Sequence, residues 1–158
     1  MRASKKDIPH VNFTLSQDEV FQYCTDDNFP IEHRWGIGSI LLNNDAAYVS
    51  IPNPHCVFIA LPTSNSGVYE VHVAVSPEGR GVNAVIGARQ SIVEFFKDMP
   101  TVHKFIGFTP LHLKRAIAFS RMVGFSKEGV SKKSFLKDGK LHDQLISGFM
   151  REEVSRWA

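Results

Sequence analysis

Residues 73–86 have the sequence VAVSPEGRGVNAVI, and this stretch decides how the chain folds. An apolar run ends at Ser76-Pro77, the short loop Glu78-Gly79-Arg80-Gly81 follows, and an amphipathic segment then begins. The start of a helix presents unpaired backbone N–H groups at the positive end of its dipole, so it attracts anions. Two glycines let a phosphate come close to the backbone, and Arg80 adds a charged donor. The stretch indicates either a phosphate-binding loop or an ordinary turn between a strand and a helix.

The wider pattern predicts one domain built on a mixed sheet. Strands are expected at residues 37–42, 46–51, 56–61, 68–75, 103–108, 130–136 and 141–150. Helices are expected at residues 16–23, 81–97 and 109–124, the last with Thr109 as N-cap and Pro110 at its first position. Residues 1–12 are expected to form a polar arm, and the turn at Asp138-Gly139 is typical of a β-hairpin. Antiparallel hairpins together with at least one parallel crossover indicate an α/β or α+β fold with a single sheet.

Composition narrows the class of protein. Hydrophobic residues make up 43% and charged residues 22% of the 158 residues, which is ordinary for a globular domain. Lysine and arginine total 18 against 16 acids, and no basic patch with interleaved aromatic residues is visible, so no nucleic-acid partner is predicted. The loop is neither a Rossmann G-x-G-x-x-G nor a P-loop ending in Gly-Lys-Ser/Thr.

Targeting, membrane and metal signals are missing from the sequence. The basic start has no apolar run behind it, and no apolar stretch approaches the ~20 residues that cross a bilayer. Cys24 and Cys56 fit no metal or redox spacing, and no two histidines lie four residues apart. A cytoplasmic protein with two free thiols, no membrane association and no metal is therefore predicted.

From about residue 68 to residue 150 the chain resembles the GNAT superfamily of acyl-CoA-dependent N-acyltransferases. The residues that carry the resemblance are Val75-Ser76-Pro77-Glu78-Gly79-Arg80-Gly81 for the strand end and loop, Met122-Val123-Gly124-Phe125 for a helix end, and Glu128-Gly129 with Asp138-Gly139 for the closing hairpin. The resemblance implies one domain over residues 1–158, with an acceptor-side half at 13–67 and an acetyl-CoA-binding core at 68–150. It also implies that the parallel strands 71–75 and 103–108 splay apart.

The activity implied is direct transfer of an acetyl group from acetyl-CoA to an amine on a small molecule or a protein, assisted by a general base. The resemblance places the pantetheine arm along the strand edge and the pyrophosphate at the following loop and helix start. The residues it assigns to the cofactor are Val73, Val75, Arg80, Gly81, Val82, Asn83, Ala84 and Val85. For Arg80, a solvated loop charge is the alternative to a phosphate contact.

Four residues depart from the pattern of the family. Asn83 and Val85 stand where glycine or alanine is usual, Ser120 stands where many members have a tyrosine that protonates the leaving thiolate, and Leu113 replaces an asparagine. A second hypothesis therefore stays open: a protein of this fold that has lost catalysis and serves as a structural or binding module, for example a virion-associated component of a divergent, phage-type member. The acceptor and the oligomeric state, a homodimer included, also stay open.

Three residues are candidates for catalysis. Glu70 lies in a strand of valines, where desolvation is expected to raise its pKa toward that of a base; an exposed or ion-paired glutamate is the alternative. His72 lies on the same face of the strand, and an imidazole changes its charge near neutral pH; a hydrogen-bonded structural histidine is the alternative. Ser120 is expected to orient a water or the sulfur, unless it is only a helix-face serine bonded to the preceding turn.

Overall fold

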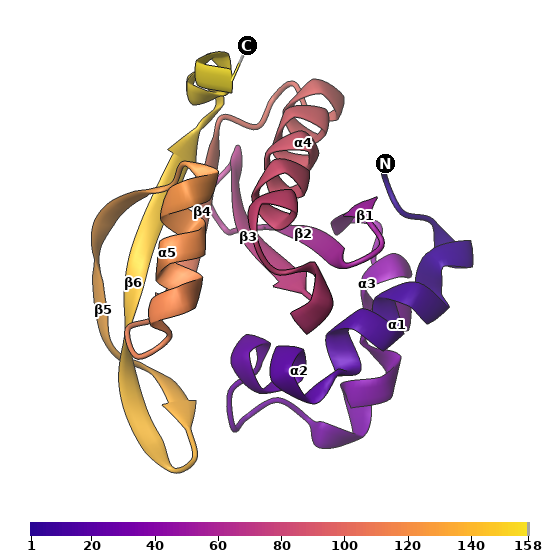
Figure 1. The fold of residues 1–158 in the computed structure, drawn as a ribbon. Helices are drawn as coiled ribbons and strands as arrows, with labels where there is room; N and C mark the ends of the chain where they lie inside the picture. The colour runs from indigo at the N-terminus through magenta and orange to yellow at the C-terminus, as the bar shows by residue number, and fades with distance from the viewer. Residues whose placement is uncertain (158) are drawn as a thin grey trace.

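A six-stranded mixed sheet runs through the protein, a computed structural model that describes residues 1–157 (Figure 1). The strand order is β1-β2-β3-β4-β6-β5, and only β3 and β4 are parallel. The strands are β1 (Tyr48–Asn53), β2 (Cys56–Pro62), β3 (Val68–Val75), β4 (Lys104–Pro110), β5 (Ser126–Lys137) and β6 (Lys140–Met150). The helices are α1 (Ile8–Ser16), α2 (Asp18–Cys24), α3 (Ile37–Leu42), α4 (Val82–Asp98) and α5 (Lys114–Val123), with 3-10 turns at Lys5–Asp7, Ile31–Gly36, Pro77–Gly79 and Arg151–Trp157. The predicted mixed single-sheet fold with a C-terminal hairpin is confirmed.

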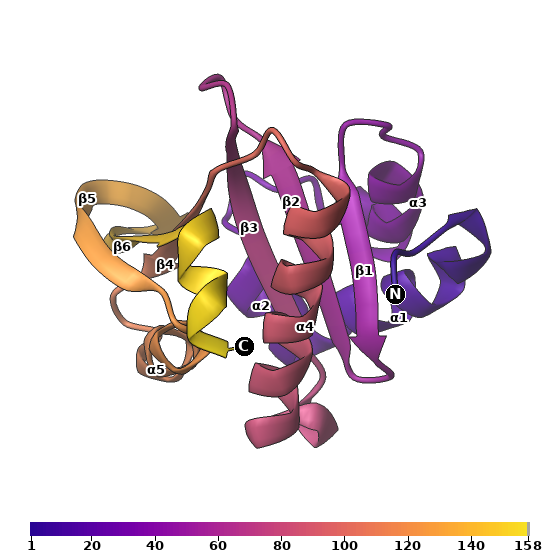
Figure 2. The same cartoon turned by 90° about the horizontal axis from the view of Figure 1, so that it is seen from above.

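Helices cover both faces of the sheet (Figure 2). On one face α4 buries an aromatic core in which Phe95 and Phe96 pack on Phe105 of β4. On the other face α1 and α2 bury a second cluster that includes Val11, Leu15, Val20, Val49, Val57 and Ala74. Alternate residues of a strand point to opposite faces, so the side chains of β3 are divided between the two cores.

The long helix α4 forms as its period predicts. Its buried stripe consists of Ala84, Val85, Ala88, Ile92, Phe95 and Phe96. Gly87 lies so close to β1 that a Cβ atom there would stand 2.8 Å from Asn53 Nδ2. The helix therefore lies directly on the sheet and carries its N-terminus to the end of β3.

The hairpin between β5 and β6 has the turn that Asp138-Gly139 predicts. Both residues have positive φ angles, 51° and 73°, as a two-residue type I′ turn requires. Such a turn matches the right-handed twist of the two long strands, so the hairpin is the best-specified local element of the C-terminal half.

Three local expectations are wrong. Residues 1–12 do not form an arm: Ala3 N–H donates to Val49 O (2.8 Å), and the helix that begins at Ile8 fully buries Val11. Residues 37–42 form α3 rather than a strand, because a short apolar run has no periodicity that separates the two, and Gly38 N–H donates to Asn12 Oδ1 (2.7 Å) of α1.

The third error concerns helix starts. Pro110 pairs with Gln144 as the last residue of β4, and α5 begins only at Lys114. Ser16 ends α1 instead of capping the next helix, which begins at Asp18. Edge and terminal positions of a strand accept a proline, so a Thr-Pro pair alone did not fix the helix start.

None of the helices within residues 1–157 has the length and apolar character that crossing a membrane requires. Both cysteines are free, Cys24 exposed and Cys56 buried.

Candidate active site

The two parallel strands at the centre of the sheet pair over only part of their length. The β3–β4 register runs from Val68 with Lys104 to Glu70 with Ile106. Beyond these three pairs β3 continues to Val75 with a partner only in β2. One edge of residues 71–75, which contains Val73 and Val75, is therefore left without a strand partner. This is the splay that was predicted.

The open edge leads directly into the start of α4. Gly81 precedes the helix with a φ of +123°, a conformation that strains any other residue, and a Cβ there would meet nothing within 4 Å. The backbone N–H groups of Val82 and Asn83 belong to the first turn, which has no intrahelical acceptors for them. The N–H groups of Ala84 and Val85 instead donate to Gly81 O at 3.1 and 3.4 Å, and both side chains are buried. Anion-binding capacity therefore concentrates at residues 81–83.

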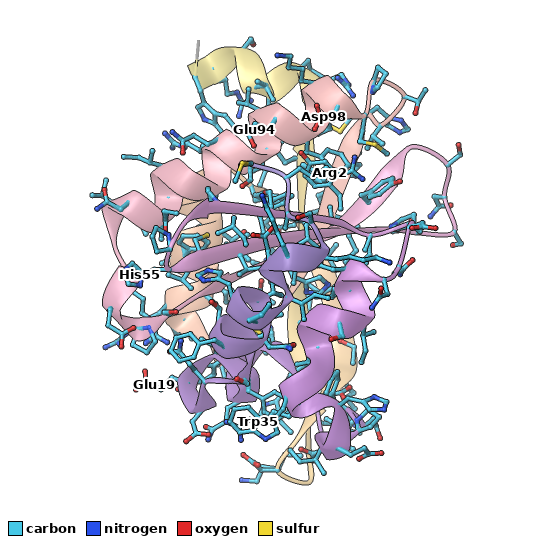
Figure 3. All side chains as sticks on the ribbon, turned by 90° about the vertical axis from the view of Figure 1, so that its right-hand side faces the viewer. Arg2, Glu19, Trp35, His55, Glu94 and Asp98 are labelled. Carbon is cyan, nitrogen blue, oxygen red and sulfur yellow. The ribbon has the colours of Figure 1, made fainter. Side chains whose placement is uncertain are left out.

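The Arg80 side chain has a partner on α2. Its Nη1 lies 3.0 Å from Glu19 Oε2. In Figure 3 Glu19 lies on the side of the molecule that also carries His55, and Gly79 of the loop packs on the His55 side chain. Gln17 of the same segment donates to Ser76 Oγ (3.1 Å). The loop after β3 is thus attached to the start of α2, and the Arg80 guanidinium is held by a carboxylate of that helix.

Glu70 and His72 form a hydrogen-bonded pair on one face of β3. His72 Nε2 lies 3.1 Å from Glu70 Oε1, and the two side chains are 41% and 35% exposed. They share a face with Ala74, which packs in the cluster of α1 and α2, so both point to the side of the sheet that these helices cover.

The predicted pKa change at Glu70 is wrong in sign. The hydrogen bond from His72 lowers the pKa of the Glu70 carboxyl, and this effect exceeds the opposite effect of desolvation. Because His72 uses Nε2 for Glu70, its Nδ1 keeps a lone pair that can accept a proton. The pair therefore has the arrangement of a carboxylate-oriented imidazole rather than of an isolated basic glutamate.

Comparison with known proteins depends on structure alone. No protein-family model and no curated protein sequence matches the chain. A spermidine N-acetyltransferase from Vibrio cholerae, solved with CoA and spermine, superposes with a TM-score of 0.77 at 12% identity over 98% of this chain and 96% of that chain. A ribosomal-protein-S5-alanine acetyltransferase from Vibrio fischeri gives 0.72 at 12% identity over 97% and 92%. An acetyltransferase of the GNAT family from Streptococcus pneumoniae gives 0.67 at 11% identity over 95% and 96%.

This chain has the GNAT fold. The likeness in fold extends over nearly the whole length of the chain.

Within the GNAT fold, Ser120 does not lie beside the Glu70–His72 pair. It is half-buried near the end of α5, and its carbonyl accepts the N–H groups of Gly124 and Phe125 (both 3.1 Å). Val123 of the same helix packs with α4, so α5 lies on the opposite face of the sheet from Glu70 and His72. Leu113, the other departure on α5, is its N-cap and makes no side-chain capping bond.

Two residues with interactions at this site were not found from sequence. Glu19 reaches Arg80 across 61 positions, and Asp27 reaches Gly139 across 112. Neither carries a local signal, because an exposed acid in a polar segment is ordinary and only the fold reveals its partner.

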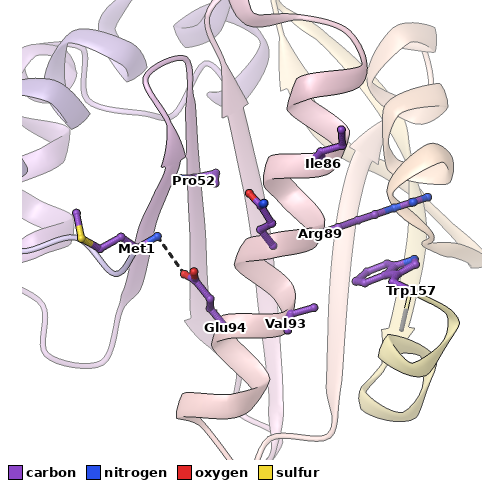
Figure 4. A pocket seen from close by; sticks show the side chains of 8 residues that line it. Met1, Pro52, Ile86, Arg89, Val93, Glu94 and Trp157 are labelled. Carbon is purple, nitrogen blue, oxygen red and sulfur yellow. Dashed lines mark ion pairs between the residues drawn. The ribbon is translucent and has the colours of Figure 1, made fainter.

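A separate hollow lies elsewhere on the surface. It has a volume of about 530 Å³ and lies over the exposed side of α4 (Figure 4). Its lining residues are Met1, Pro52, Ile86, Arg89, Gln90, Val93, Glu94 and Trp157, and none belongs to β3 or β4. It is therefore separate from the candidate site.

Proposed function

We propose that this protein transfers an acetyl group from acetyl-CoA to an amine. The observation that carries the proposal is the unpaired edge of β3 leading straight into the open, glycine-capped start of α4. An extended amide-containing arm can pair with such an edge as an added strand would, and a diphosphate suits the free N–H groups at the helix start. One continuous surface therefore offers contacts for both parts of acetyl-CoA.

The residues present fit this co-substrate. Val73 and Val75 provide the strand edge, and Gly81, Val82 and Asn83 provide backbone donors, with open space beside the Cα atom of Gly81. Arg80 would join them by exchanging Glu19 for a phosphate. When bound, acetyl-CoA supplies the acetyl group as an activated thioester.

The chain's own groups would then handle the proton of the amine. His72 Nδ1 accepts it, and the Glu70 carboxylate stabilises the resulting imidazolium through Nε2. Ser120 lies on α5, on the opposite face of the sheet from this pair, and stays our candidate for a hydrogen bond to the leaving sulfur or to a water beside it. Positioning of the two substrates supplies the rest of the rate enhancement.

The co-substrate is tested by thermal unfolding. At a concentration a hundred times its Kd, acetyl-CoA should stabilise the fold by about 2.7 kcal/mol, which raises the Tm of a domain this size by about 5–10 °C. An unchanged Tm at millimolar acetyl-CoA would overturn the proposal.

The reaction is tested by thiol release from acetyl-CoA with a panel of amines that includes spermine and a peptide beginning with alanine. Glu70→Gln should lower kcat by about a hundredfold, the usual contribution of an acid–base group. Glu152→Gln removes an exposed carboxylate outside the site and should leave turnover unchanged.

Two observations favour a second function, a binding module of the same fold. The pKa of Glu70 is lowered rather than raised, and a serine stands at position 120. A binding module would show the rise in Tm with acetyl-CoA but no thiol release with any amine of the panel, so the same two assays separate the two functions.

A further inference from the structure

A network of four hydrogen bonds fastens the link after α2 to the tip of the β5–β6 hairpin. Asp27 N–H donates to Leu136 O (2.9 Å), and Lys137 Nζ donates to Thr25 O (3.0 Å). The Asp27 carboxylate accepts the N–H of Asp138 (3.0 Å) on one oxygen and that of Gly139 (2.9 Å) on the other. We call this network, formed by Thr25, Asp27 and residues 136–139, the Asp27 clasp.

The geometry of the turn makes the carboxylate a specific partner. The positive φ angles of Asp138 and Gly139 direct two successive N–H groups outward, a concave arrangement of donors that binds anions. The two bonds lower the pKa of the Asp27 carboxyl, with Gly139 contributing most. An alanine could make neither bond, and an asparagine could offer only one acceptor oxygen.

The Asp27 clasp joins the two halves of the molecule on the side where Glu70 and His72 open. Val20 of α2 packs in the cluster that contains Ala74 of β3, so α2 lies on the same face as the Glu70–His72 pair. The hairpin belongs to the half beyond the splay, because β6 pairs with β4. The clasp therefore spans from the β1–β3 side to the β4–β6 side across the splay.

The clasp has little apolar support. Asp27, Asp138 and Gly139 are exposed and Lys137 and Leu136 are half-buried, so Thr25 is the one buried residue of the clasp. Regions held by exposed hydrogen bonds open locally without global unfolding. The clasp can therefore open while the two cores of the sheet stay intact.

We propose that Asp27 is a positioning residue for the acceptor: by fastening the hairpin tip to the link after α2, it confines the amine in front of the Glu70–His72 pair. The inference rests on the proposed transferase function. It assigns Asp27 no contact with the reacting atoms, so its effect falls on acceptor binding and not on the chemical step.

The test compares Asp27→Ala with Asp26→Ala in the thiol-release assay, with spermine and the alanine-starting peptide as acceptors. Asp26 is the matched control, because its carboxylate accepts the nearby N–H of Asn28 (3.0 Å) and, within residues 1–157, has no hydrogen bond or ion pair to the hairpin. In Asp27→Ala the KM for the acceptor should rise about tenfold, as the loss of charge-assisted hydrogen bonds predicts, while kcat and the KM for acetyl-CoA stay within about twofold. Asp27→Asn should fall between the two.

Hydrogen exchange gives a readout independent of activity. The amides of Asp138 and Gly139 should exchange faster in Asp27→Ala and unchanged in Asp26→Ala. Unchanged exchange of these two amides in Asp27→Ala would show that the Asp27 clasp does not form in solution. Faster exchange of the amides with an unaltered KM for the acceptor would overturn the positioning role of Asp27. If the unsubstituted protein showed no Tm rise with acetyl-CoA or no turnover, the proposed function would fail, and this inference would fail with it. Normal turnover with an unaltered KM for the acceptor in Asp27→Ala would overturn this inference alone.

Discussion

The pairing of Glu70 with His72 lowers the pKa of the Glu70 carboxyl. The hydrogen bond from His72 is the first cause of the lowered pKa of Glu70, whose ordinary value is 4.5. A carboxyl group with a depressed pKa stabilises the folded state at pH values above its unfolded pKa, and this contribution disappears as the pH falls through the folded pKa. The hydrogen bond between His72 and the Glu70 carboxylate therefore contributes to stability at neutral pH and not in strong acid.

His72→Gln should raise the pKa of Glu70 toward 4.5 or above, since desolvation then acts with less opposition. A carbon-13 NMR titration of the Glu70 carboxyl measures this directly. The difference in unfolding free energy between the two proteins should be largest near neutral pH and should shrink below pH 4.5. His142→Gln, on β6, is the control. A Glu70 pKa unmoved by His72→Gln would show that the pair does not form in solution.

At the scale of the element, α2 connects the loop after β3 with the tip of the β5–β6 hairpin. Its first turn holds Arg80 through Glu19, and the link that follows it carries the Asp27 clasp. An anion at the start of α4 must compete with Glu19 for the guanidinium, because one Arg side chain cannot keep the same hydrogen bonds to both. The ion pair is surface-exposed, so the competition is expected to be modest.

Glu19→Gln should therefore tighten acetyl-CoA binding by about threefold, because it removes an exposed ion pair that holds Arg80. Arg80→Gln should weaken acetyl-CoA binding by about tenfold, because it removes a charge-assisted hydrogen bond to phosphate. Isothermal titration calorimetry at fixed ionic strength measures both. Glu32→Gln removes an equal charge from the same half of the chain and serves as the control. If Glu19→Gln and Glu32→Gln changed the affinity for acetyl-CoA equally, the cause would be the loss of one negative charge and not the release of Arg80.

How well each element could be predicted depends on the length of its signal. The helix at 82–98 and the strand at 68–75 carry a clear period over many residues, so sequence alone placed them and put Glu70 and His72 on one face. The six residues of α3 carry none, and their helix depends on Gly38 packing against α1. The position and the facing of a residue can thus be predicted from sequence where a single long element determines both.

The candidate site was less accessible for the same reason. The strand edge and the loop follow from local pattern, but the sign of the pKa change at Glu70 depends on the hydrogen bond from His72. Glu19 and Asp27 act on residues that only the folded sheet brings near them. Contacts between distant segments leave no trace in one sequence, whatever their importance to the site.

At the scale of the whole molecule, the C-terminal segment caps the end of α4 with hydrogen bonds. Arg151 follows β6 and its guanidinium donates to three backbone carbonyls: Phe96 O and Val102 O, both at 2.7 Å, and Met99 O. These carbonyls lie at and just beyond the end of the helix, where the chain has no further helical N–H groups to satisfy them and where the dipole favours a cation. Cation and carbonyls are partly buried together, so the contact ties the last strand to α4, the helix that follows the loop after β3.

Arg151→Ala should lower the free energy of unfolding by about 2–4 kcal/mol, because it leaves partly buried carbonyls without charge-assisted donors. The matched control is Arg156→Ala, which removes an exposed guanidinium paired with Glu153 three residues earlier and should cost at most about 0.5 kcal/mol. Urea unfolding followed by circular dichroism measures both. Arg151→Lys should recover only part of the loss, since a single ammonium group cannot span three carbonyls as the guanidinium does. Equal stability of the two alanine variants would show that α4 ends securely without the C-terminal segment.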